Sequence, residues 1–142
     1  MASSSIGGTG KLPHILVVDD ALVQRMVTER LLKLHSFKVT TVDSGDKALE
    51  LLGTWTAAMK KVDMILTDYS MPKMTGYDLL KRLKESSAFQ GIPVVIMSSE
   101  NTRGITRCLE EGAIDFMIKP LQNSDVQRLY THFNHHLQIK LE

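Results

Sequence analysis

The sequence predicts an α/β protein in which five parallel strands form one open, doubly wound sheet covered by helices on both faces. Short apolar runs alternate with amphipathic segments from residue 14 to the end of the chain, and such strict alternation is typical of parallel sheets. The strand segments are almost continuously apolar, as strands buried on both faces are. Five such units are too few for an eight-stranded barrel.

The first two strands are expected at residues 14–18 and 37–42, and the second is rich in β-branched residues. The helix between them is predicted from apolar residues at helical spacing. These residues are Val23, Met26, Val27, Leu31 and Leu34. Ser44 is a suitable N-cap for the next helix, whose apolar residues are Ala48, Leu51 and Leu52.

The third and fourth strands are expected at residues 62–67 and 93–97, with a loop containing proline and glycine at 68–76 after the third. Thr75 and Asp78 match the S/T-x-x-D capping arrangement, which predicts that a helix begins there. Its apolar face carries Leu79, Leu80 and Leu83.

The fourth helix is expected to end at Gly112 as a C-cap and to bury Ile105, Cys108 and Leu109 together. The fifth strand follows at 113–118. The last helix is predicted from the spacing of Val126, Leu129, Tyr130, Phe133 and Leu137. We expect one domain over residues 13–139, preceded by a disordered lead-in at 1–12 and followed by a tail at 140–142.

Length, composition, net charge and cysteine count limit the classes of function that the chain can have. The chain has 142 residues, 43% of them hydrophobic and 23% charged, which is typical of a single globular domain. With 17 basic and 16 acidic residues, the net charge of +1 gives no bulk attraction to nucleic acid or an anionic membrane. The single cysteine excludes an internal disulfide and fits a reducing compartment. No apolar run approaches the roughly 18–20 residues that span a bilayer.

Chemically useful residues follow four of the five predicted strands, and ligands of open α/β sheets bind beyond the carboxyl ends of the strands. These residues are Asp19 and Asp20, Asp68, Ser98, and Lys119. If the first and third strands are neighbours, the three carboxylates converge and repel one another. Mg²⁺ would relieve this repulsion, because it binds one or two carboxylates together with water and phosphate oxygens.

The same residues suit phosphoryl chemistry. A carboxylate such as Asp68 can attack a phosphoryl group and carry it as an aspartyl phosphate. Mg²⁺ and Lys119 would compensate the charge of the phosphoryl oxygens, and Ser98 can donate a hydrogen bond to one of them. Pro120 suits a fixed turn after the lysine, for which a cis Lys119–Pro120 bond is one form.

Taken together, these residues resemble the signature of response-regulator receiver domains of two-component signalling, over about residues 14–137. Within that family, several segments are similar to plant type-A response regulators, which are short receivers without a DNA-binding domain. The segments lie at 42–45, 67–69, 71–72, 74–77, 96–101 and 107–112. The resemblance implies a flavodoxin-like (βα)5 fold with strand order 2-1-3-4-5.

The resemblance also implies a role for each site residue. Asp68 would be the phosphoacceptor, assisted by Lys119 and Ser98. One Mg²⁺ ion would be bound by Asp68, directly by Asp20, mainly through water by Asp19, and by the backbone carbonyl of Ser70. Ser98 and Phe116 would form the switch pair, in which the aromatic ring moves inward when the serine turns toward the phosphoryl group.

The functions implied by the resemblance are those of a stand-alone phosphorelay regulator. Its donor would be a phosphohistidine on a histidine kinase or histidine-containing phosphotransfer protein, docked over the first helix. A downstream protein would bind the face formed by the fourth helix, fifth strand and fifth helix. The expected setting is negative feedback in cytokinin signalling, in nucleus or cytoplasm, as a monomer without direct nucleic-acid or membrane contact. The only catalysis expected is assistance to its own phosphorylation and slow dephosphorylation.

Other interpretations are open. A phosphohydrolase with an aspartyl-phosphate intermediate typically has a second acid two residues after the nucleophile, where this chain has Ser70; many plant relatives have cysteine there. A binding module that is never phosphorylated would have lost a key residue, and none is lost. Asp19 and Asp20 could instead form a helix N-cap, and Phe116 could be plain core.

Two other features have structural interpretations. Cys108 is expected to be a small core residue. His132 and His136 have a spacing that can hold a metal, but we expect them on the solvated surface because no acidic or cysteine partner is evident.

Overall fold

The computed structural model describes residues 12–55, 61–100 and 103–141. Five parallel strands form one sheet in the order β2-β1-β3-β4-β5, which confirms the predicted fold and strand order. The strands are β1 (His14–Val18), β2 (Lys38–Val42), β3 (Met64–Asp68), β4 (Val94–Ser98) and β5 (Asp115–Ile118). The helices are α1 (Leu22–Leu34), α2 (Gly45–Thr54), α3 (Gly76–Lys84), α4 (Arg103–Glu110) and α5 (Asn123–Leu141).

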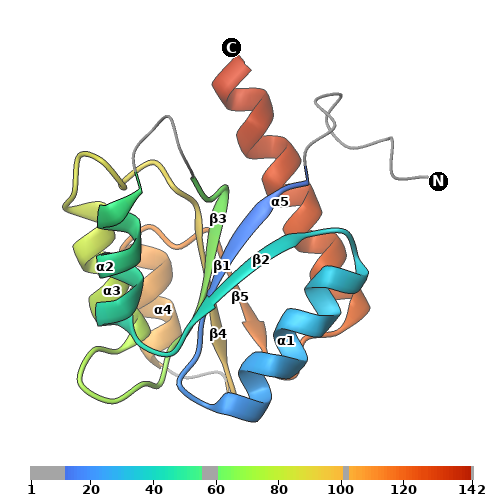
Figure 1. Ribbon diagram of the computed structural model, residues 1–142. Coiled ribbons are helices and arrows are strands. Elements are labelled where there is room, and N and C mark those ends of the chain that lie inside the picture. The colour runs from blue at the N-terminus through green and yellow to red at the C-terminus, as the bar shows by residue number, and fades with distance from the viewer. Residues whose placement is uncertain (1–11, 56–60, 101–102, 142) are drawn as a thin grey trace.

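The sheet separates two hydrophobic cores. Helices α1 and α5 cover one face, and α2, α3 and α4 cover the other (Figure 1). Because side chains alternate along a strand, Leu16 and Val18 of β1 enter the core beneath α2 and α3, whereas Ile15 and Val17 enter the core beneath α1 and α5. All five residues of β1 are therefore buried, which explains the apolar run that follows His14 in this strand.

The helix ends that were predicted from capping residues are confirmed. The Ser44 side chain accepts a hydrogen bond from the backbone N–H of Lys47 at 3.1 Å. At α3, the Thr75 side chain and the Asp78 carboxylate each accept a bond from the other residue's backbone N–H, completing a capping box. Gly112 has φ +114° and follows α4 in a left-handed C-cap conformation, as glycine permits.

The apolar stripe that predicted α1 is not the face that packs on the sheet. Thr28 and Leu32 are buried, whereas Leu34 is 81% exposed. Three more residues of the stripe are at least half exposed, namely Val23, Met26 and Val27. Only Leu31 of the stripe is packed, in part, against the core. Helix α1 thus presents an apolar surface to solvent.

A second correction concerns α4. Ile105 and Cys108 are buried as predicted, but Leu109 is 41% exposed. It lies about 100° further round the helix than Cys108 and so points away from the core. Burial raises the pKa of the Cys108 thiol to about 11, which agrees with the prediction of an unreactive core residue.

Some segment limits also differ. The expected strand at 113–118 begins at Asp115, and that at 62–67 runs from Met64 to Asp68. Helix α5 continues to Leu141, past the expected end of the domain at 139. The expected lead-in at 1–12 lies, apart from Leu12, outside the described residues. No helix in the described ranges is long and apolar enough to cross a membrane.

Candidate functional site

Three carboxylates converge at the carboxyl ends of two neighbouring strands. Strands β1 and β3 pair directly, with Val18 opposite Thr67, so the residues that follow are brought together. Carboxylate oxygens of Asp19, Asp20 and Asp68 all lie within 4.8 Å of one another. Asp19 and Asp68 are buried, whereas Asp20 is exposed. The predicted acidic cluster therefore exists and opens to solvent on one side.

Asp19 is held by the beginning of α1 but does not cap that helix. Its Oδ1 accepts a hydrogen bond from the Ala21 N–H at 3.0 Å, and its backbone carbonyl accepts one from Arg25 at 2.8 Å. The N-cap of α1 is Ala21, which has no side-chain capping bond. The alternative interpretation of the two aspartates as an N-cap pair is therefore wrong.

Lys119 reaches into the acidic cluster from the end of β5. Its Nζ lies 3.0 Å from Oδ2 of Asp68 and 3.4 Å from Oδ2 of Asp19, and it also donates a hydrogen bond to Oε1 of Gln24. The backbone N–H of Lys119 donates to the Ser98 carbonyl at 2.8 Å. The Lys119–Pro120 peptide bond is cis. The lysine is thus fixed at its backbone and at its ammonium group.

The balance of charge leaves Asp68 incompletely compensated. Burial is the largest influence on Asp68 and raises its pKa, as does the charge of Asp19. The hydrogen bond and charge of Lys119 lower the pKa, and so does the hydrogen bond from the Ser70 N–H. The net effect is a raised pKa. One ammonium faces three carboxylates, and oxygen ligands of this kind are those that a hard divalent cation prefers. The cluster therefore fits a divalent metal ion.

The loop after β3 folds tightly back onto Asp68. The Gly76 N–H donates to the Tyr69 carbonyl at 2.8 Å. A Cβ atom at Gly76 would lie 2.5 Å from the backbone oxygen of Asp68, so a larger residue would displace the loop. Ser70 is exposed in this loop. Glycine at position 76 therefore allows the β3–α3 loop to pack beside the acidic cluster.

Ser98 ends β4, and its hydroxyl is engaged within the following loop. Its Oγ donates to the Glu100 carbonyl at 2.7 Å and accepts from the Glu100 N–H at 3.2 Å. Phe116 lies opposite Ile96 on the adjacent strand and is partly buried against the core beneath α3 and α4. The predicted switch residues thus occupy neighbouring strands, two positions apart.

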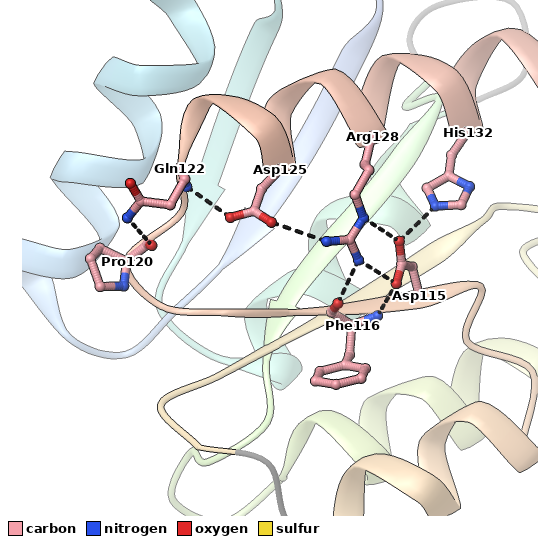
Figure 2. A network of polar contacts seen from close by, with 7 residues as sticks. All are labelled: Asp115, Phe116, Pro120, Gln122, Asp125, Arg128 and His132. Atoms are coloured by element: carbon pink, nitrogen blue, oxygen red, sulfur yellow. Dashed lines mark hydrogen bonds and ion pairs between the residues drawn. The ribbon is translucent and has the colours of Figure 1, made fainter.

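A second polar network, which the sequence analysis missed, connects β5 to α5 (Figure 2). Arg128 donates to Asp115 through Nη2 at 2.6 Å and Nε at 3.2 Å. It also donates to Asp125 at 3.2 Å and to the Phe116 carbonyl at 3.0 Å. His132 lies with its Nε2 2.8 Å from Asp115 Oδ2. The network therefore joins one strand to two successive turns of the last helix.

Asp115 is the acidic partner that the sequence analysis did not find for His132. The expectation that His132 is only solvated surface is therefore wrong. The two residues are 17 positions apart, and only the packing of α5 on β5 brings them together. The spacing of Asp125 and Arg128 would have indicated their helical contact. Among the described residues, the grouped metal ligands are those of the acidic cluster, not His132 and His136.

Comparison with known proteins assigns the family. The family model described as "response regulator receiver domain" matches residues 15–131, so the chain belongs to that family. This confirms the predicted receiver and places the chain among signalling receivers rather than classical enzymes. A chain described as a CheY-like receiver domain protein from Methanospirillum hungatei JF-1 has the same fold, with a TM-score of 0.79 at 18% identity over 90% of this chain and 98% of that one.

Within the family, the chain is similar to plant two-component response regulators. It is 56% identical to ARR3 of Arabidopsis thaliana over 91% of this chain and 59% of that protein. It is 59% identical to ORR5 of Oryza sativa subsp. japonica over 84% of this chain and 87% of that protein. The chain thus spans less than two thirds of ARR3 but most of ORR5.

Proposed function

We propose that this chain is a phosphorelay response regulator that accepts a phosphoryl group on Asp68 from a phosphohistidine of a partner protein. The observation that carries the proposal is the convergence of three carboxylates with one lysine bonded to Asp68. An Asp68 oxygen forms a bond to phosphorus while the phosphorus–nitrogen bond of the donor breaks. The electron pair of that bond leaves with the imidazole nitrogen.

The acidic cluster would hold one Mg²⁺ ion. Asp20 and Asp68 would be direct ligands, Asp19 would act mainly through water, and Ser70 would contribute its backbone carbonyl. When bound, the ion compensates negative charge on the carboxylates and on the transferred group. The protein's own contribution is Lys119, whose Nζ is already 3.0 Å from the acceptor carboxylate and can follow the phosphoryl oxygens.

Ser98 and Phe116 would convert phosphorylation into a change of shape. To donate to a phosphoryl oxygen, the Ser98 hydroxyl must release the Glu100 carbonyl, to which it is bonded at 2.7 Å. That release separates Ser98 from Glu100, and the ring of Phe116, half-buried on the neighbouring strand, moves into the space vacated. The readout would therefore begin at the α4–β5 edge.

Stoichiometric acceptance is favoured over phosphohydrolase turnover by the residue at position 70. Protonating a leaving group requires an acid near the nucleophile, and Ser70 supplies none. The phosphoryl group would leave slowly, assisted only by the residues that accepted it. Ser70 is expected to affect the lifetime of the phosphoryl group.

The partner surfaces follow from the exposed apolar residues. The α1 face, defined here as Leu22, Val23, Met26 and Val27, is 52–71% exposed beside the acidic cluster and would receive the phosphodonor. Leu109, Ile114 and Ile118 are 40–42% exposed around α4 and β5 and would contact a downstream protein. Similarity to plant regulators supports negative feedback in cytokinin signalling, in nucleus or cytoplasm, by a monomer.

The donor surface can be tested with a phosphorylated histidine-containing phosphotransfer protein. Val23→Asp places a charge on the α1 face and should slow transfer from that protein by tenfold or more. Phosphorylation by acetyl phosphate should be unchanged, because a small donor needs no docking surface. Leu34→Asp, at the far end of the same helix and 81% exposed, is the matched control. Equal loss in both variants would place docking elsewhere.

A further inference from the structure

We propose that Gln24 is a positioning residue for phosphoryl transfer, whose side-chain oxygen holds the Lys119 ammonium over the strand ends. This inference rests on the proposed function. Gln24 lies on α1, the helix beside the acidic cluster, and its Oε1 accepts a hydrogen bond from Lys119 Nζ. The sequence analysis did not single it out, because its contact is with a residue 95 positions away.

The three donors of the lysine are all in use. An ammonium group has three N–H bonds, and Nζ of Lys119 contacts Oδ2 of Asp68 at 3.0 Å, Oδ2 of Asp19 at 3.4 Å, and Oε1 of Gln24. The acceptors come from β3, the end of β1, and α1 respectively. Contacts with three elements therefore restrain the ammonium, although its four-carbon stem is flexible.

Two of these acceptors change during the proposed reaction, and one does not. Asp68 loses a free carboxylate oxygen when it bonds to phosphorus. Asp19 belongs to the set that would hold the metal ion. Gln24 does neither, because its amide is neutral and is not one of the three carboxylates of the acidic cluster. Its oxygen is therefore the acceptor that keeps Lys119 in place while the other two bonds are exchanged for bonds to phosphoryl oxygens.

The neutral amide matters as much as the contact. A carboxylate at position 24 would add a fourth negative charge beside one ammonium and would compete with Asp68 for it. The amide restrains the lysine without that competition. Gln24 also lines a surface depression with Val23, Val27, Ser99 and Lys119. The restraint therefore sits where a donor on the α1 face would meet the acceptor.

Gln24→Leu tests the inference, because it removes the acceptor at similar side-chain size. The rate of phosphorylation by saturating acetyl phosphate with Mg²⁺ should fall about tenfold, the effect of one lost bond to a charged group. In a Lys119→Met background the same substitution should cause no further loss. A loss that persists without the lysine would overturn the inference. Gln127→Leu, on an exposed surface of α5, is the matched control.

A second measurement requires no phosphoryl transfer. The ammonium signal of Lys119 in ¹⁵N NMR should show slow proton exchange in the wild type and fast exchange in Gln24→Leu. Gln24→Glu should keep slow exchange yet still reduce the rate, because it draws the lysine away from Asp68. Unchanged exchange in Gln24→Leu would overturn the inference even if Asp68 is phosphorylated normally. Failure of the wild type to accept phosphate would contradict the proposed function and the role of Gln24 in transfer, whereas the exchange measurement alone reports whether Gln24 holds the lysine.

Discussion

Two groups of aspartates, one at the carboxyl ends of β1 and β3 and one between β5 and α5, differ in how fully their charge is compensated. At the acidic cluster, the cation that contacts the carboxylates of Asp68 and Asp19 among the described residues is Lys119. In the β5–α5 network, Asp115 is paired with both Arg128 and His132. The pKa of Asp68 is raised, whereas the pKa of Asp115 is lowered.

Burial alone does not explain the contrast, because it is the largest influence on both groups and raises both pKa values. At Asp115, hydrogen bonds from Arg128, from His132 and from the Phe116 N–H outweigh burial. At Asp68, the hydrogen bond from Lys119 does not outweigh burial. The negative charge of Asp19 also raises the pKa. The incompletely compensated carboxylate, Asp68, belongs to the cluster that fits a cation, and we propose that it accepts the phosphoryl group, while Asp115 joins β5 to α5.

Mg²⁺ should give the largest difference in stability between variants of the acidic cluster and variants of the β5–α5 network. An ion that binds only the folded protein should raise the free energy of unfolding by about 2.7 kcal/mol at a hundredfold excess over Kd. Asp20→Asn should lose most of this gain, and Asp115→Asn should keep it. Thermal melts with and without Mg²⁺ measure the difference. An equal gain in both variants would contradict a metal site confined to the acidic cluster.

Asp115→Asn should give the next largest effect, a loss of about 1–2 kcal/mol in the free energy of unfolding at neutral pH. Because the folded-state pKa of Asp115 lies below its ordinary value of 3.8, its contribution is present above that pH. It disappears as the pH falls through the folded-state value. Denaturant titrations at neutral pH and well below pH 3.8 test this, with Glu50→Gln on the exposed surface of α2 as control. A loss that does not diminish with acid would contradict the ionic origin.

Asp68→Asn should raise the stability of the fold, and by less than Asp115→Asn lowers it. Since the folded-state pKa of Asp68 is raised, its ionisation destabilises the fold as the pH rises through that value. Without Mg²⁺ at neutral pH, the variant should melt higher by about 4 °C, the shift given by roughly 1 kcal/mol in a domain of this size. The difference should vanish well below pH 3.8, where Asp68 is neutral in both the folded and the unfolded state. A lower melting temperature would show that Asp68 is compensated after all.

The sequence was sufficient for the parts of the molecule that depend on local pattern. Alternating apolar and amphipathic segments predicted the sheet, and residues directly after strands predicted the acidic cluster, because parallel strands end at the same edge. Contacts made by helices across the sheet were not predictable. The contacts of Asp115 with His132 and of Lys119 with Gln24 are examples. They depend on which turn of α5 or α1 faces the strand ends. The exposed stripe on α1 was missed for the same reason, since spacing identifies an apolar face but not what covers it.

The acceptance of one phosphoryl group by Asp68 is tested most directly by the intact mass of the protein after incubation with acetyl phosphate and Mg²⁺. The wild type should gain the mass of one phosphoryl group, and Asp68→Asn should gain none. Asp115→Asn, which removes a compensated aspartate, should still be labelled. Labelling of the Asp68→Asn protein, or none of the wild type, would contradict the assignment of Asp68 as the acceptor.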